Sequence, residues 1–447
     1  MAGAQEPDLV STRRQRIAEL AQRDKQLAFT SLNHHLGIDW MREAFWRTRR
    51  DGAPGVDGQT AGDYEANLET NLRSLLDRAK SGTYRAPPVR RVHSPKGYGS
   101  NETRPIGIPT LEDKILQRAV VMALDPIYEQ DFYDCSYGFR PGRSAHTALE
   151  DLWRQTMNLA GGWVLEVDIR KFFDTLDHGH LRDLLKQRVR DGVLLRLIGK
   201  WLNAGVWESG AVTYPSAGSP QGGVISPLLA NIYLHYVLDD WWHKEVKPRL
   251  TGRAFLIRYA DDFVIGFEHE EDARRVLEVL PKRFGKYGLT IHPDKTRLVP
   301  FQRPQERKRW DEPRPKDRPG TFDFLGFTHY WGKSRKGSHV VKRRTAADRI
   351  RRFAKAIAGW CRKNRHQPIG KQHQTLSQKL TGHYGYYGLT GNYALLARVK
   401  LIAVRTWRKW LSRRSWKGYF RWGDMAGLLE RLPLPAPRVV HSVYQRG

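Results

Sequence analysis

The sequence predicts an α+β fold in which strands and helices share the first part of the chain and helices alone follow. Residues 255–267, FLIRYADDFVIGF, hold two short apolar runs on either side of an acidic corner, which is the pattern of a β-hairpin. Residues 163–176, WVLEVDIRKFFDTL, begin as a strand of the buried type and lead into an amphipathic helix. From about residue 342 onward, apolar residues recur at helical spacing.

Charge indicates the kind of partner. The 447-residue chain has a formal net charge of +29, so a polyanion is expected, and nucleic acid is the leading candidate. Residues 301–447 hold 34 Lys and Arg against 8 Asp and Glu, whereas residues 1–300 hold 42 against 39. Aromatic residues alternate with these C-terminal cations, which suits a surface that contacts phosphates and stacks on bases. A solvated helical bundle is the alternative, and the imbalance of sign disfavours it.

Other partners and compartments are disfavoured by what the sequence lacks. No apolar run approaches the roughly 20 residues that span a bilayer, so no membrane partner is expected. The N-terminus lacks the apolar core of a secretory signal. Two cysteines, Cys135 and Cys361, cannot form a four-cysteine zinc site or a disulfide framework. We therefore expect a cytoplasmic protein.

The N-terminal elements follow from periodicity and turn residues. Helices are expected over 12–50 and 62–80, separated by a turn-rich break. Prolines and glycines exclude a long helix over 84–110, which is expected to form short extended pieces. Thr110 and Asp113 then form a capping-box pattern at the start of a core helix.

Three polar residues on these early segments suit phosphate or nucleotide binding. Lys96 and Arg104 lie on the extended pieces, and Arg offers a planar fork where Lys offers a mobile point charge. Both would otherwise be ordinary surface cations. Gln221 lies in a glycine-rich loop before a helix that starts near Ser226, where a substrate can approach the backbone closely.

Carboxylates stand at two strand ends. Asp168 ends the strand over 163–167, and Asp261 with Asp262 forms the hairpin corner. At a turn two adjacent carboxylates can lean toward one point, and a divalent metal between them would offset their repulsion. A solvated Asp-Asp turn explains the corner about equally well on its own, and a helix cap is the commoner role for an isolated Asp168.

The next segments complete the predicted sheet and its connection to the helices. Residues 289–299 read as a strand, a turn and a strand, with Lys295 after the turn. Residues 302–320 are charged and proline-rich, as in a linker or a surface insertion. Residues 322–327, FDFLGF, resemble a further hairpin strand.

Taken in order, several motifs resemble those of the reverse transcriptases encoded by bacterial group II introns, the intron-encoded maturase family. They are RPIGIPT, VDIRKFFD, SPQGGVISPLLANIYLH, YADD, HPDKT and FLGF, and the resemblance covers nearly the whole chain from about residue 32. It implies a right-hand polymerase, with fingers and a palm built on an antiparallel sheet. An all-α thumb that doubles as the maturase domain follows.

The resemblance also implies domain boundaries. The expected segments are 1–300 for an N-terminal extension with fingers and palm, 301–320 for a linker or surface insertion, 321–340 for a primer-grip hairpin, 341–420 for the helical thumb or maturase domain, and 421–447 for a basic tail.

By the same resemblance, Asp168, Asp261 and Asp262 are the metal-binding triad, and the Ile169 carbonyl is a further ligand. Nucleotide addition is an in-line phosphoryl transfer. Two Mg²⁺ ions roughly 4 Å apart, or Mn²⁺ in their place, activate the primer hydroxyl and neutralise the leaving pyrophosphate.

The remaining nucleotide contacts are implied in the same way. Lys96 and Arg104 match the cations of the fingers that hold the triphosphate. Phe173 matches the aromatic gate that excludes a ribose 2′-hydroxyl. Gln221 would lie beside the incoming nucleotide, and Lys295 could protonate the departing pyrophosphate.

The family implies an RNA-directed DNA polymerase of a bacterial group II intron that binds its structured intron RNA and assists splicing and retrohoming. Its partners would be that RNA, an RNA template with a DNA primer, dNTPs and target DNA. No HNH-type endonuclease with cysteine pairs is recognisable, so the primer would come from elsewhere. A maturase with an idle polymerase, a domesticated enzyme of DNA repair or phage defence, and a DNA-templated polymerase are the alternatives. The sequence leaves the oligomeric state open.

Overall fold

The structure is a computed structural model, and the residues that it describes are 9–95, 103–159, 161–214, 218, 222–304, 319–415 and 418–442. Lys96 and Gln221, both predicted to contact the nucleotide, lie outside these residues. So do residues 305–318 of the predicted linker.

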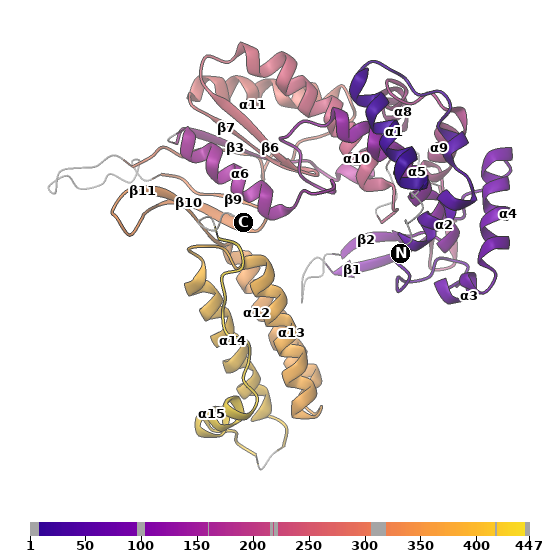
Figure 1. Ribbon diagram of the computed structural model, residues 1–447. Helices are drawn as coiled ribbons and strands as arrows, with labels where there is room; N and C mark the ends of the chain where they lie inside the picture. Colours follow the sequence, from indigo (N-terminus) through magenta and orange to yellow (C-terminus); the bar gives the residue numbers. More distant parts are fainter. Residues whose placement is uncertain are drawn as a thin grey trace, which may run out of the picture.

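The N-terminal block is helical and is built around one long buried helix, α5, on which α1 and α2 pack (Figure 1). Trp40 is fully buried there and donates a 2.9 Å hydrogen bond to the Ala119 carbonyl. The helix predicted over 62–80 is two helices, α3 and α4. The helices of this block are α1 (Leu9–Arg23), η1 (Leu32–His35), α2 (Ile38–Trp46), α3 (Ala61–Glu65), α4 (Leu68–Ser81), α5 (Leu111–Asp131), α7 (Phe172–Thr175), α8 (His178–Lys186) and α9 (Gly192–Leu202).

The predicted start of α5 is confirmed in part. The Thr110 hydroxyl accepts a hydrogen bond from the Asp113 amide, as an N-cap does. The Asp113 carboxylate accepts a hydrogen bond from the Tyr84 hydroxyl instead of completing the capping box. Burial raises the pKa of Asp113 to about 8, which suits a carboxyl group held in the core by a neutral partner.

The described residues within 84–110 include two short strands, as predicted. They belong to a four-stranded sheet in the order β2-β1-β4-β5, with β1 and β2 antiparallel and Arg104 opposite Ser94. The strands are β1 (Val89–Pro95), β2 (Thr103–Ile108), β4 (Val206–Glu208) and β5 (Ala211–Thr213).

The central sheet is antiparallel, in the order β6-β7-β3-β8. Side chains along each strand pack alternately into two cores, because successive side chains point to opposite faces of the sheet. Leu165 and Ile265 pack into the core on the α11 side, whereas Val164 and Val264 pack into the core that includes α6. The elements are α6 (Ala145–Asn158), β3 (Trp163–Asp168), α10 (Ser226–Leu234), η2 (His235–Asp239), η3 (Trp242–Val246), η4 (Lys247–Arg249), β6 (Ala254–Tyr259), β7 (Asp262–Phe267), α11 (Glu270–Gly285) and β8 (Arg297–Pro300).

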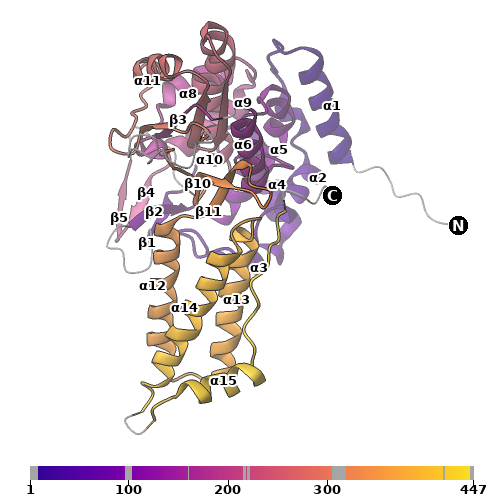
Figure 2. The same cartoon turned by 90° about the vertical axis from the view of Figure 1, so that its left-hand side faces the viewer.

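A three-stranded antiparallel sheet, ordered β11-β10-β9, joins the central sheet to an elongated helical bundle (Figures 1 and 2). Within the segment 421–447, expected as a basic tail, residues 422–431 form a helix, α15, whose Met425 and Leu428 are buried in the bundle core. No helix in the described part of the chain is long and apolar enough to cross a membrane. The elements are β9 (Phe322–Phe324), β10 (Phe327–Lys333), β11 (His339–Thr345), α12 (Ala347–Asn364), α13 (Ile369–Tyr387), α14 (Tyr393–Leu411) and α15 (Trp422–Arg431).

Candidate active site

The hairpin predicted over 255–267 is present. β6 and β7 pair in antiparallel register, and Tyr259 is the partner of Asp262, so Ala260 and Asp261 form a two-residue turn. Ala260 has a φ of 57°, in the left-handed region that tight hairpin turns require. A non-glycine residue is held there only where neighbouring contacts determine it. The conformation of the acidic turn is therefore held in place by its neighbours.

Pairing between strands brings a third carboxylate to this corner. β7 also pairs with β3, and Asp168 is the direct partner of Asp262. Side chains directly opposite in antiparallel strands have Cβ atoms about 4.5–5.5 Å apart. Asp168, Asp261 and Asp262 thus lie at one edge of the central sheet.

The electrostatics of this edge oppose full ionisation. Burial, and then the charges of Asp261 and Asp168, raise the pKa of Asp262 to about 7. The Asp262 side chain is open to solvent but has protein on most sides, so its surroundings are poorer in water than its exposure alone indicates. Burial also raises the pKa of Asp261, Asp168 adds to this, and Arg104 opposes it. Two of the three carboxylates are therefore costly to charge without a cation.

Lys295 supplies one cation directly. Its Nζ lies 3.0 Å from Oδ2 of Asp168, although the two residues are 127 positions apart. The segment before Lys295 is fixed by backbone pairing, because the His292 amide donates to the Asp168 carbonyl over 2.8 Å. Both side chains are exposed, so the ion pair can exchange for other partners.

The same pairing places Ile169, the predicted carbonyl ligand. Ile169 forms an isolated antiparallel bridge with Ile291. The two hydrogen bonds across it use the Asp168 carbonyl and the Arg170 amide, which donates to Thr290. The Ile169 carbonyl is not needed for the pairing.

Phe173 and the glycine-rich loop lie together. Phe173 is half-buried in the short helix α7, with its ring centroid 5.3 Å from that of the buried Phe172. Gly218 has a φ of +93°, and a Cβ there would lie 2.8 Å from the Phe173 carbonyl oxygen. The described end of the loop, Gly222, has a φ of +118° and lies against the Gly107 carbonyl of β2, which also carries Arg104. Gly218 and Gly222 thus lie against the segments that carry Phe173 and Arg104.

The donors at this edge are of the kind that Mg²⁺ prefers, namely carboxylate oxygens. Within the described residues, however, no group of three or more His, Cys, Asp or Glu side chains already has a geometry that could hold a metal ion. Asp168 is paired with Lys295 instead. The residues fit a divalent cation in chemistry and charge, and some rearrangement of side chains would have to accompany binding.

Other contacts of the acidic edge were not predicted. The buried Glu166, two residues before Asp168, accepts hydrogen bonds from Arg297 and from the Asp323 amide of β9, at 2.7 and 2.5 Å. The Leu325 amide, in the turn after β9, lowers the pKa of the Asp262 carboxyl and so opposes part of the effect of burial. A charged residue inside an apolar run, such as Glu166 in WVLEVD, was the available signal, but its partners are distant in sequence.

An antiparallel sheet with clustered acids at one edge and cations opposite them suits an enzyme of phosphoryl transfer. The family described as "Reverse transcriptase (RNA-dependent DNA polymerase)" matches residues 94–329, more than half of the chain. The chain belongs to this family, and it is an RNA-directed DNA polymerase.

The chain is also similar to several named proteins. The chain is 34% identical over 392 residues to Protein YkfC of Escherichia coli K12, covering 78% of this chain and 96% of that protein. It is 38% identical over 285 residues to the group II intron-encoded protein LtrA of Lactococcus lactis, covering 60% of this chain but 46% of LtrA. It is 30% identical over 233 residues to the mitochondrial nuclear intron maturase 2 of Arabidopsis thaliana, covering 43% of this chain and 30% of that protein.

Proposed function

We propose that this protein copies RNA into DNA with Asp168, Asp261 and Asp262 at its catalytic centre, and that it does so as the enzyme of a group II intron. The observation that carries the proposal is the register of β3 and β7, which sets Asp168 directly opposite Asp262 beside the turn that holds Asp261. The raised pKa values of Asp261 and Asp262 support it, because clustered acids of perturbed pKa are typical of functional sites.

The three carboxylates, with the Ile169 carbonyl, would hold two Mg²⁺ ions, for which Mn²⁺ could substitute. When bound, the metal supplies Lewis acidity at the reacting phosphate and at the primer hydroxyl. Lys295 would leave Asp168 and take the position from which an ammonium donates a proton to the departing pyrophosphate.

The other predicted residues orient the nucleotide. Arg104 and Lys96 would hold the triphosphate, and the influence of Arg104 on the pKa of Asp261 supports its closeness to that site. Phe173 would exclude the 2′-hydroxyl, and Gln221 would contact the base or sugar. The position of Gly218 against the Phe173 backbone supports placing that loop and that gate around one nucleotide.

The architecture fits a right-hand polymerase. Residues 1–300 would supply the N-terminal extension, fingers and palm, and the hairpin within 321–340 would grip the primer. Residues 341–420, which include the bundle helices α12, α13 and α14, would be the thumb and maturase domain. α15, from the segment 421–447, packs on that bundle and would belong to it.

Intron RNA is the proposed structured partner. The basic C-terminal third supports this, since exposed Arg and Lys on α12, α13 and α14 suit a phosphate backbone. The names of LtrA and of the Arabidopsis maturase point the same way. Assistance to splicing and insertion into target DNA would follow from that binding.

Primer extension tests the catalytic assignment. Purified protein is incubated with an RNA template, a DNA primer and dNTPs in Mg²⁺, and single-turnover rates are compared for the parent and for Asp168→Asn, Asp261→Asn and Asp262→Asn. Each variant should lose activity by roughly 10³-fold or more while still binding primer and template. Asp183→Asn on α8, an exposed acid outside the edge, is the control. An Asp261→Asn variant with parental rates would refute the assignment.

A separate assay tests the RNA partner. RNA that copurifies with the protein is sequenced, and any intron found is incubated with the protein under low Mg²⁺ to follow splicing. The triad variants should still promote splicing if RNA binding and polymerisation use different surfaces. If no structured RNA is enriched while primer extension is robust, the domesticated polymerase becomes the better account.

A further inference from the structure

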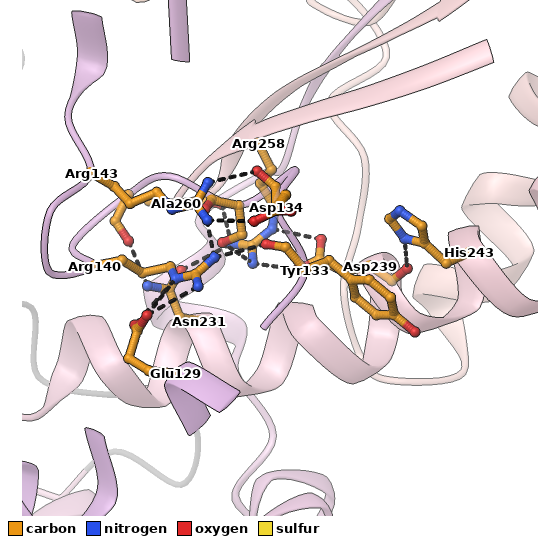
Figure 3. A network of polar contacts seen from close by, with 12 residues as sticks. Glu129, Tyr133, Asp134, Arg140, Arg143, Asn231, Asp239, His243, Arg258 and Ala260 are labelled. Carbon is orange, nitrogen blue, oxygen red and sulfur yellow. Dashed lines mark hydrogen bonds and ion pairs between the residues drawn. The ribbon is translucent and has the colours of Figure 1, made fainter. Parts of the chain in front are cut away.

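The acidic turn rests on a buried arginine. Arg258 is the last residue but one of β6, two positions before Ala260, and its side chain is completely buried. The guanidinium donates to both carboxylate oxygens of Asp239, over 2.8 Å from Nε and 2.5 Å from Nη2 (Figure 3). Asp239 is also completely buried.

The remaining hydrogen bonds of the Arg258 guanidinium go to the acidic turn and to the segments around that turn. Nη1 donates to the Ala260 carbonyl over 3.0 Å and to Oδ1 of Asn231 over 2.9 Å. Nη2 also donates to the Ser136 hydroxyl over 2.7 Å. One rigid guanidinium therefore joins β6, the segment before α6, the helical stretch α10–η2 and the turn itself.

The segment around Gly138 contacts both Asn231 and the acidic turn. The amide nitrogen of Asn231 donates to the Gly138 carbonyl over 2.6 Å. Gly138 lies so close to the turn that a Cβ there would be 2.4 Å from the Ala260 nitrogen. Arg140, itself 7% exposed, holds the same segment by donating to the Tyr133 and Ser136 carbonyls over 2.7 and 2.8 Å.

We infer that Arg258, held by Asp239, is a positioning residue for catalysis that fixes the Ala260–Asp261 peptide and so aims the Asp261 and Asp262 carboxylates. The Ala260 carbonyl belongs to the peptide group that leads into Asp261. Ala260 has a left-handed backbone conformation, which neighbouring contacts must hold in place. Stability alone explains this pair poorly, because burying two charges costs desolvation energy that well-packed apolar side chains avoid. The inference rests on the proposed catalytic role of the two aspartates.

Replacing both Arg258 and Asp239 distinguishes an effect on the position of the catalytic carboxylates from an effect on stability. In Arg258→Met/Asp239→Leu, apolar side chains of similar size fill the space, and no unpaired buried charge remains. We expect a cooperatively folded protein whose kcat for dNTP incorporation falls about 10²-fold, since small misplacements of reacting groups cost that much. The KM values for dNTP and for primer-template should stay within a few-fold of the parent.

A second buried ion pair supplies the matched control. Arg188 and Asp131 are joined over 2.8 Å, with side chains 3% and 9% exposed, and Arg188 also donates to backbone carbonyls near α1. Arg188→Met/Asp131→Leu should keep the parental kcat at a temperature where both proteins are folded.

A single substitution keeps the inference testable if the double variant fails to fold. Arg258→Lys retains the charge opposite Asp239, but one ammonium cannot also reach Asn231 and the Ala260 carbonyl in the geometry of a fork. Its kcat should fall about tenfold with KM unchanged. A folded Arg258→Lys or double variant with the parental kcat overturns the inference, provided that Asp261→Asn is inactive. If Asp261→Asn is active, the catalytic assignment itself fails.

Discussion

Tyr386 of the helical bundle donates a 2.9 Å hydrogen bond from its hydroxyl to the carbonyl of Leu325, in the turn between β9 and β10. The backbone amide of Leu325 acts in turn on Asp262, because it lowers the pKa of that carboxyl and so opposes part of the effect of burial. Leu325 has a φ of 50°, so this turn, like the acidic one, is held in an uncommon conformation. Leu325 therefore contacts the bundle through its carbonyl and influences the acidic edge of the central sheet through its amide.

Removing the Tyr386 hydroxyl should weaken this link without unfolding the protein. A net hydrogen bond contributes about 1 kcal/mol, so Tyr386→Phe should lower the single-turnover rate of dNTP incorporation roughly fivefold. Tyr384→Phe on the same helix is the control, because the buried Tyr384 hydroxyl has no hydrogen-bond partner among the described residues. Equal rates for the two variants would show that the turn holds Asp262 without help from the bundle.

Local patterns were enough to predict the elements of the site. The two apolar runs on either side of the acidic corner predicted the hairpin, and the apolar run before Asp168 predicted a strand that ends there. Asp177 and Ser144 cap their helices, and each side chain accepts a hydrogen bond from the amide three residues later. These features depend on contacts within a few residues, which a single sequence displays directly.

Contacts between distant segments could not be predicted in this way. Arg258 looked like an interruption of an apolar strand, because Asp239, Asn231 and Ser136 are 19 to 122 positions away. The ion pair of Lys295 with Asp168 likewise spans 127 positions. A buried charge in an apolar run indicates that a partner exists, but only the folded chain identifies it.

Phe173 offers a test of sugar selection. Shortening it to Val should admit the 2′-hydroxyl, and the ratio of ribonucleotide to deoxynucleotide incorporation should rise roughly 10- to 100-fold. Competition assays with labelled rCTP and dCTP on one template measure that ratio. Phe172→Leu is the control, because Phe172 is 2% exposed and packs into the core, so it should lose stability and keep the parental ratio. A Phe173→Val enzyme with unchanged selection would place the gate elsewhere.

His329 should make stability depend on pH. It is fully buried on β10, its ring is stacked 4.7 Å from that of Phe322, and burial, with a smaller effect of Arg343, lowers its pKa to about 3. In the unfolded chain this histidine takes up a proton near pH 6.5, whereas in the folded chain it stays neutral until the pH approaches 3. The neutral, buried state of His329 is therefore fully compatible with folding above pH 6.5, and the free energy of unfolding decreases as the pH falls from 6.5 toward 3.

Replacing this histidine should flatten that dependence. The melting temperature of the parent should fall more steeply between about pH 6.5 and 5 than that of His329→Phe, which keeps the ring and cannot titrate. His329→Leu should flatten it too, even if its overall stability differs. Parallel curves for the parent and both variants would mean that His329 takes up its proton in the folded state as well.

The face of α12 defined by Arg351, Lys355 and Arg362 should carry part of the affinity for RNA. Their spacing of four and seven residues places them on one side of the helix, and all three are exposed. Each cation that pairs with a phosphate releases counterions, so replacing all three by Gln should weaken binding most at low salt. It should also reduce the slope of log K against log salt by about one for each phosphate that is no longer neutralised. Fluorescence anisotropy with a structured RNA between about 50 and 200 mM salt measures both effects.

The control replaces three cations on α11, a helix at the opposite end of the molecule in Figure 1, by Gln, so that the change of charge is equal. These cations are Arg274, Arg275 and Lys282. A general decrease in net charge would lower both slopes alike, whereas a binding face on the bundle lowers only the first.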